Sequence, residues 1–242
     1  MGKLQNNKGA AMKSLMKAFK KAIALDSTIH RYLKVKMPDN YSFMKDVEIV
    51  PLTYSEILSA TMYYPVMFGI QNKTVFPFAV VGINNENVFL TEDGTWKVDV
   101  IPNVCKYYPF GVLKEADEYT IIFDEIFASD DGQRLFDEEG ADTEFFSKIK
   151  AGLTELARDF RDAEDCANEL FQEGYFMPLN IDVDTKLGKM KFRNMLMVNV
   201  EQFTRIQPEK LYALNSKGYL LILYAHYLSL RNFKLFDIFV TV

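Results

Sequence analysis

The chain has 242 residues, of which 49% are apolar, 14% aromatic and 25% charged. This balance is typical of a folded protein with one large or two small domains, and it excludes a disordered chain, a collagen or a coiled-coil array. The net charge of −5 argues against general nucleic-acid binding, so no nucleic acid is expected among the partners. Two cysteines are too few for a disulfide scaffold, which indicates a reducing compartment or indifference to redox state.

Basic and acidic residues are divided unevenly along the chain. Residues 1–36 contain nine Lys or Arg and one acid, whereas residues 115–173 contain five basic and 19 acidic residues. We expect the two regions to attract each other, within one molecule or between copies, and salt to weaken that attraction.

The N-terminal region, residues 1–37, is predicted to be a basic amphipathic helical arm. Its apolar residues recur at helical spacing, with lysines on the other side: Met12, Leu15, Met16, Phe19 and Ile23. One interpretation is a frayed extension that leans on the body through Phe19 and Ile23. Another is an arm that docks on an anionic membrane or a partner, with contacts from Lys13, Lys17, Phe19, Lys20 and Lys21. The third is a targeting peptide, although lysines interrupt the apolar residues too often for a secretory signal.

The body, residues 38–242, is predicted to be a single α+β domain with a mixed, largely antiparallel sheet. Thr53 and Glu56 form a capping-box pattern at the start of a short helix, and Asn84-Asn85 favours a hairpin turn. Strands are expected over 47–52, 76–82, 87–90 and 119–123.

A long amphipathic helix is predicted between Thr143, which suits its N-cap, and Gly174, which suits the position after its end. Apolar residues step along it by three or four from Phe145 to Leu170. The elements expected after it are a hairpin over 179–192, a short helix over 208–214, a buried helix over 219–230 and a final strand over 233–242. The run 219–230 is too short to cross a bilayer, so no transmembrane span is predicted.

Motifs that carry chemistry are scarce. The chain has two histidines and lacks Walker A, Gly-x-Gly-x-x-Gly, Cys-x-x-Cys and His-Glu-x-x-His patterns, so neither a metal site nor a cofactor is predicted. The acidic run over 130–142 lacks EF-hand spacing and is interpreted as a solvated loop. Candidate catalytic residues are His226, Asp124 and Trp96. His226 is alternatively a hydrogen-bonded core histidine, and Asp124 is followed by Glu125 on a strand end, where neighbouring carboxylates point to opposite faces.

An ordered set of short segments is spread along the body. It includes Val50-Pro51-Leu52-Thr53, Tyr64-Pro65-Val66-Met67-Phe68, Phe76-Pro77-Phe78, Gly94-Thr95-Trp96, Tyr107-Tyr108-Pro109-Phe110, Asp124-Glu125, Gly218-Tyr219-Leu220 and Tyr224-Ala225-His226. Together these segments resemble the SapC family of bacterial proteins over roughly residues 41–235. The chain departs from the family's pattern at Val98-Asp99-Val100, where a tyrosine usually precedes Val-Pro, and at Asn194, where glycine is common.

The resemblance implies a link to surface-layer protein, because the family takes its name from a surface-layer locus that also encodes a type I export system. We therefore expect a cytoplasmic accessory or binding protein, peripheral to the inner membrane if the arm binds lipid, with surface-layer or type I export components as partners. The alternative is an enzyme that modifies a peptide or protein and works with neighbouring cupin-like or halogenase-type proteins. The expected binding residues are Tyr108, Pro109, Phe110 and Tyr224, because aromatic-Pro-Phe segments make suitable walls for a peptide groove.

Overall fold

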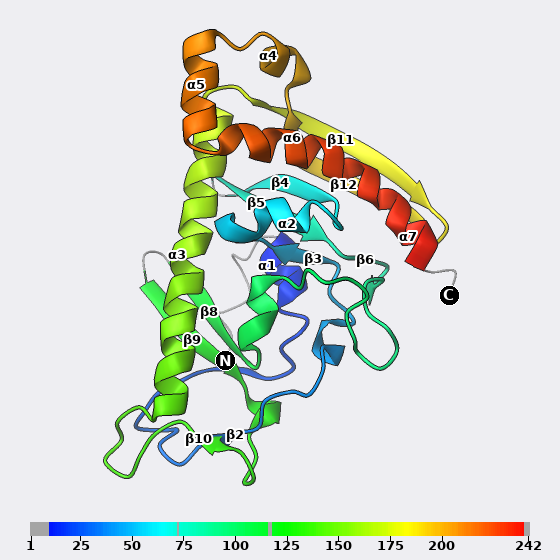
Figure 1. The fold of residues 1–242 in the computed structure, drawn as a ribbon. Helices are drawn as coiled ribbons and strands as arrows, with labels where there is room; N and C mark the ends of the chain where they lie inside the picture. Colours follow the sequence, from blue (N-terminus) through cyan, green and yellow to red (C-terminus); the bar gives the residue numbers. More distant parts are fainter. Residues whose placement is uncertain (1–9, 72, 116–117, 240–242) are drawn as a thin grey trace.

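The computed structural model describes residues 10–71, 73–115 and 118–239. One long helix, α3 (Glu144–Gln172), runs along the length of the molecule beside two antiparallel sheets (Figure 1). The C-terminal part of the described chain is helical and lies across the larger sheet. The structure therefore confirms the predicted α+β class.

The larger sheet has five antiparallel strands and lies beside the C-terminal half of α3. Its strand order is β11-β12-β4-β5-β3. The strands are β3 (Ile49–Pro51), β4 (Val66–Gln71), β5 (Thr74–Val80), β11 (Phe176–Thr185) and β12 (Gly188–Val198). Helices α6 (Tyr219–Ser229) and α7 (Phe233–Phe239) lie along β11 and β12 in Figure 1, and α3 packs against β5. The main hydrophobic core lies between these layers.

The smaller sheet has three antiparallel strands in the order β1-β9-β8. They are β1 (Ala22–Ala24), β8 (Phe110–Glu115) and β9 (Glu118–Asp124). A second core packs this sheet against the N-terminal half of α3 and contains Phe110, Phe123, Leu135, Phe136, Phe146, Leu153 and Leu156. Two short strand pairs complete the β-structure: β2 (Lys34–Val35) with β10 (Gln133–Arg134), and β6 (Gly82–Ile83) with β7 (Glu86–Asn87).

The remaining helices are short. The α-helices are α1 (Ala10–Leu15), α2 (Ile57–Ala60), α4 (Val200–Thr204) and α5 (Pro208–Ser216). The 3-10 turns are η1 (Ser42–Met44), η2 (Tyr54–Glu56), η3 (Asn103–Tyr107), η4 (Glu125–Phe127) and η5 (Leu230–Asn232).

The predicted long helix is confirmed. The hairpin turn at Asn84-Asn85 is present, and so is the hairpin over 179–192, whose strands β11 and β12 pair. Thr143 caps α3, because its hydroxyl oxygen accepts a hydrogen bond from the Phe146 backbone N–H at 3.2 Å. Gly174, with φ of +80°, follows its last turn in the left-handed conformation that ends many helices. Asn84 and Asn85 both adopt positive φ in the turn between β6 and β7, as two-residue hairpins of this kind require.

The prediction of a helical arm over residues 1–37 is wrong beyond Leu15, and residues 1–9 of that arm lie outside the described residues. Helix α1 ends at Leu15, and Ile23 lies in β1, where it pairs with Phe123 of β9. Strand pairing satisfies the backbone of residues 22–24 with interstrand hydrogen bonds, which a helix over the same residues excludes. The residues that precede β1 are packed against the body, since Ser14 and Ala18 are both buried.

The predicted final strand is also wrong. Residues Phe233–Phe239 form helix α7, which buries Phe233 and Phe236 on one side, and residues 240–242 of the predicted strand lie outside the described residues. A spacing of three residues places two side chains on one helix face but on opposite faces of a strand, so helix formation buries both rings. Helix α6 is present as predicted, although only one of its faces is buried: Ile222, Leu223, His226 and Ser229.

We expect the N-cap of α3 to contribute measurably to stability. Replacing Thr143 by Ala removes the acceptor for the Phe146 N–H and should lower the free energy of unfolding by about 1 kcal/mol. The matched control is Thr154→Ala, since Thr154 is exposed in the helix interior, where Ala is the better helix former. Chemical denaturation of both variants measures the difference, and equal stabilities would contradict the capping role.

Candidate functional site

Asp124, the last residue of β9, is fully buried although its side chain is ionisable. Its Oδ1 accepts a hydrogen bond from the backbone N–H of Lys21 and its Oδ2 accepts one from the backbone N–H of Lys20, each at 2.8 Å. The Tyr108 hydroxyl donates to the same Oδ2 at 2.7 Å. Three donors therefore converge on one carboxylate, which offsets its loss of water. The candidate catalytic residue thus anchors the segment that leads into β1.

Tyr108 lies at the centre of an aromatic cluster, the Tyr108 cluster, formed by Phe19, Phe43, Tyr108 and Phe127. Phe43 stacks on Tyr108 with ring centres 3.8 Å apart, and Phe19 and Phe127 meet Tyr108 edge-on at 5.1 and 5.2 Å. Burial, followed by the hydrogen bond to Asp124, raises the pKa of the Tyr108 hydroxyl. The hydroxyl therefore stays protonated and serves as a donor, which holds the ring in place.

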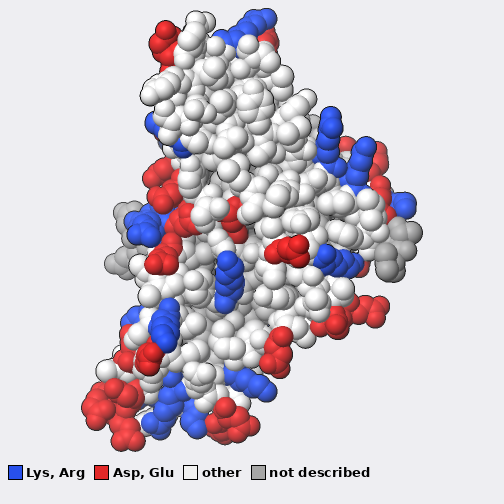
Figure 2. Space-filling view, viewed as in Figure 1, with Lys and Arg blue, Asp and Glu red and all other residues white. Residues whose placement is uncertain are grey.

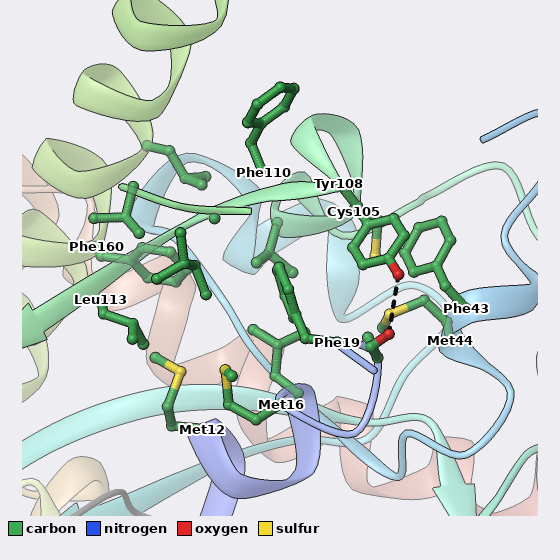
Figure 3. Close-up of a pocket in the computed structure, with 17 residues that line it drawn as sticks. Met12, Met16, Phe19, Phe43, Met44, Cys105, Tyr108, Phe110, Leu113 and Phe160 are labelled. Carbon is green, nitrogen blue, oxygen red and sulfur yellow. Dashed lines mark hydrogen bonds between the residues drawn. The ribbon is translucent and has the colours of Figure 1, made fainter. Parts of the chain in front are cut away.

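A narrow apolar cavity lies between this cluster and α3 (Figure 3). Met12, Met16 and Phe19 line it from the N-terminal segment, and Phe110 and Phe160 line it from β8 and α3. Its volume is about 40 Å³, which is enough for a water molecule but far below the size of an organic-ligand pocket. The cavity is therefore a packing gap beneath the N-terminal segment.

Phe43 lines the narrow cavity and also lines an open groove, which we call the 36–43 groove. One wall is formed by residues 36–40 with Ser42 and Phe43, and the other by residues 126–129. Its volume is about 500 Å³, within the range of ligand-binding pockets. A neighbouring cavity of about 150 Å³ shares residues 37–40 and Phe43 with it and reaches Tyr108. The groove and the Tyr108 cluster thus form one continuous feature.

Hydrogen bonds hold the two walls of the groove at a fixed spacing. The Lys36 backbone N–H donates to the Phe127 carbonyl oxygen at 3.1 Å, and the Ser129 N–H donates to the Lys34 carbonyl oxygen at 3.0 Å. Val35 and Ala128 form an antiparallel bridge between these two bonds. These backbone contacts keep the two walls of the groove apart without a bound molecule.

His226 is a buried core residue on the inner face of α6. Its Nδ1–H donates to the Val66 carbonyl oxygen at 2.8 Å, and its Nε2 accepts from the Val198 backbone N–H at 3.3 Å. Complete burial lowers the pKa of His226 to about 4, so the ring is neutral near neutral pH. Both ring nitrogens are used to join α6 to β4 and β12.

Trp96 is also buried and bonded. Its indole N–H donates to the Tyr64 hydroxyl oxygen at 2.5 Å, and that hydroxyl donates to the Val100 carbonyl oxygen. Five cavities of the described residues, including the 36–43 groove, are lined by none of Trp96, Asp124 and His226. The structure therefore does not bring the three catalytic candidates to a shared cleft in the part of the chain that it describes.

The four predicted binding residues lie in two separate places. Tyr108, Pro109 and Phe110 are buried, and only Tyr108 reaches the groove system. Tyr224 lies on the outer face of α6, half-exposed, with its ring edge-on to Phe203 at 4.6 Å. The groove residues of 36–43 and 126–129 were not predicted as a site. The sequence features of those segments that could have indicated a binding surface are Pro38 and the aromatic residues Phe43 and Phe127.

The predicted contact lysines of the N-terminal region are mostly paired with acids of the same chain. Lys17 binds Glu48 at 2.7 Å, Lys20 binds Asp46 at 3.2 Å and Lys21 binds Glu125 at 2.6 Å. Lys13 is exposed, and Phe19 packs against Tyr108. Of these pairs, only Lys21–Glu125 joins residues 1–36 to the acidic region 115–173, and the other two acids lie before that region. Exposed pairs of this kind each add at most about 1 kcal/mol.

Two further observations concern metal binding and membrane spanning by the described residues. No group of three or more His, Cys, Asp or Glu side chains is arranged to hold a metal ion within residues 10–71, 73–115 and 118–239. In the same ranges, no helix combines the length and the apolar character needed to cross a bilayer.

The fold and the groove define an α+β protein in which Asp124, Trp96 and His226 lie in the core and an open groove lies at the surface. A family model described as SapC matches residues 25–235, and the chain belongs to the SapC family. No curated protein and no solved structure matches the chain.

We expect the Asp124 carboxylate to be needed for docking of the N-terminal segment. Asp124→Asn places an amide NH₂ group against backbone N–H donors and should lower the free energy of unfolding by about 2–4 kcal/mol. Amide exchange at residues 20–24 should also become faster, as measured by hydrogen–deuterium exchange. Asp131→Asn is the matched control, because Asp131 is an exposed carboxylate in the loop after η4. Unchanged protection of residues 20–24 in Asp124→Asn would contradict this role.

Protonation of His226 is expected to favour the unfolded state at acidic pH. Its folded pKa of about 4 lies below the ordinary value of 6.5, so the unfolded chain binds a proton first as the pH falls. The stabilisation present above pH 6.5 is lost towards pH 4, with a slope of about 1.4 kcal/mol per pH unit and a total of about 3 kcal/mol. Urea unfolding across this pH range should show this slope in the parent chain and in His30→Gln. In His226→Gln the slope should be smaller, and equal slopes in all three would refute the assignment.

Proposed function

We propose that this SapC-family chain is an accessory protein that binds an extended peptide segment of a partner in the 36–43 groove. The partner is a surface-layer protein or a component of its type I export, as the family resemblance implies. The observation that carries the proposal is the open groove whose lining rings Phe43 and Phe127 pack against the buried Tyr108. The groove supplies the contact surface that an accessory role of this kind requires.

The lining of the groove suits a peptide better than a purely apolar ligand. Met37, Phe43, Ile126 and Phe127 offer apolar contacts, while Lys36, Asp39, Asn40, Ser42 and Ser129 add polar groups. An extended peptide presents both kinds of surface, since side chains alternate along it and backbone N–H and C=O groups lie between them. Ile126 is 55% exposed and gives an incoming apolar side chain a direct contact.

The rigidity of the Phe43 and Tyr108 rings favours binding. Phe43 stacks on Tyr108, and the Tyr108 hydroxyl is held by Asp124, so little side-chain freedom remains to be lost when a peptide binds. A preformed site loses less conformational entropy on association than a mobile one. Asp124 thereby supports the proposed role as a positioning residue, without contact with the peptide.

The enzymatic alternative has less support from the geometry. It requires His226, Asp124 and Trp96 to act together on a peptide, yet each side chain is buried and uses its polar atoms to hold the fold. The groove that accommodates a peptide is lined by none of the three. Binding is therefore the function that we propose.

Replacement of Ile126 by Glu is expected to weaken partner binding at least tenfold. The variant places a charge on the apolar wall of the groove while leaving an exposed position exposed, so the fold should be retained. Leu228→Glu is the matched control, because Leu228 is 56% exposed and lies on α6, outside the groove. The measurement is capture from lysate of the producing bacterium, followed by fluorescence anisotropy with peptides tiled over the captured partner.

Two outcomes would count against this proposal. One is that the parent chain captures no surface-layer or export component. The other is that Ile126→Glu and Leu228→Glu bind the tiled peptides equally well. Thermal unfolding of both variants establishes that a loss of binding does not come from a loss of fold.

A further inference from the structure

The outer face of α6 is an exposed apolar surface at the opposite end of the molecule from the 36–43 groove (Figure 1). It consists of Leu221, Tyr224, Tyr227 and Leu228, which we call the α6 face, and all four side chains are about half-exposed. The inner face of the same helix is fully used by the core. A soluble helix normally carries polar residues on its exposed side, so this arrangement requires an explanation.

The apolar surface continues onto α2 and the turn after it. Leu58 is 42% exposed and Met62 is 63% exposed. The Asn232 side-chain amide donates to the Thr61 carbonyl oxygen at 2.8 Å, which fixes this turn beside the C-terminal end of α6. Figure 2 shows the corresponding region as a broad expanse without charged residues. The α6 face and its α2 extension are therefore one continuous patch.

The size of the patch fits a modest protein–protein contact. Its six side chains expose on the order of 600 Å² of surface per molecule, which is at the upper end for a monomer and near what one partner contributes to a small stable interface. Among the described residues, the ring of Phe203 against Tyr224 is the aromatic contact made to this patch from outside α6 and α2. Most of the patch is thus left uncovered by the part of the chain that the structure describes.

The charges of the patch and its surroundings favour a second copy over a membrane. No Asp, Glu, Lys or Arg occurs between Gly218 and Arg231, so the partner surface must also be uncharged. A copy of the same face meets that condition, because a two-fold contact brings each patch against itself. The acidic helix α3 lies nearby, since Asp159 binds Ser55 next to α2 and Glu169 binds Lys217 next to α6. An anionic lipid surface would repel those carboxylates.

The spacing of the exposed residues suits helix–helix packing. Leu221, Tyr224 and Leu228 are separated by three and four residues, so they form a ridge along one side of α6. Two such ridges pack in antiparallel orientation across a two-fold axis, with Tyr224 near the axis because it lies midway along the ridge. This geometry places Leu221 of one copy opposite Leu228 of the other.

We propose that the α6 face is the interface of a homodimer, in which α6 of one copy packs antiparallel against α6 of a second copy. The inference does not depend on the proposed function, because the 36–43 groove shares no residue with the patch. In such a dimer the two grooves remain accessible, and the protein presents two identical binding sites.

Sedimentation equilibrium of the full chain over a range from about 1 to 100 μM tests the proposal, since interfaces of this size bind in the micromolar range and below. We expect a monomer–dimer equilibrium in the parent chain. Leu228→Glu should weaken the dimer at least tenfold, because it places a charge against apolar Leu221 of the second copy. Ile126→Glu, a change of the same type at matching exposure, should leave the dimer unchanged. A parent chain that stays monomeric over the whole range overturns the proposal, as does equal dimerisation of the two variants.

Cysteine cross-linking adds a test of the geometry. Tyr224→Cys should form a disulfide-linked dimer under mild oxidation, whereas Ile29→Cys, at an exposed loop position, should not. The native Cys105 and Cys166 are buried and do not interfere. Flotation with vesicles containing anionic lipid distinguishes a lipid surface: a monomer that floats through the α6 face, and loses flotation in Leu228→Glu, overturns the dimer. Linked dimers with Tyr224→Cys and no flotation support it.

Discussion

The buried carboxylate of Asp124 is the interaction on which the lower half of the molecule depends. A charged group without water is costly unless several donors reach it, and here two consecutive backbone N–H groups and the Tyr108 hydroxyl do so. Because those donors come from separate segments, one side chain joins β9, the N-terminal segment and the aromatic cluster. The position of Tyr108 in turn fixes Phe43, which divides the small cavity from the open groove. The Asp124 carboxylate thus supports the groove through Tyr108 and Phe43, although Asp124 does not line the groove.

His226 plays a comparable part in the upper half of the molecule, although its side chain is a neutral ring and not a carboxylate. A neutral ring bonded on both nitrogens ties α6 to two strands, and burial keeps it neutral. Asp124 and His226 are ionisable residues of the types that acid–base catalysts use, and His226 is one of only two histidines in the sequence. In the fold each side chain is buried, and its hydrogen bonds join segments that are distant in the chain.

Local patterns in the sequence predicted the parts of the fold that depend on neighbours in the chain. The stripe from Phe145 to Leu170 and the Thr143 cap were sufficient for α3, and Asn84-Asn85 was sufficient for a turn. Prediction failed where a distant partner decides the outcome. The helical spacing up to Ile23 is overridden by pairing with β9, a hundred residues later in the chain, and the groove is built from two loops without periodicity. No local signal reveals that residues 36–43 and 126–129 face each other.

The docking of the N-terminal segment also bears on the order in which the chain acquires structure during synthesis. Residues 14–24 emerge early, yet the partners that hold them, from Glu48 to Asp124, follow much later. Residues 14–24 must therefore wait until β9 has been made before they take their final place. Until then their lysines and apolar side chains are available to other molecules. During synthesis, residues 14–24 are consequently a basic, amphipathic segment without the ion pairs and strand pairing that hold them in the folded protein.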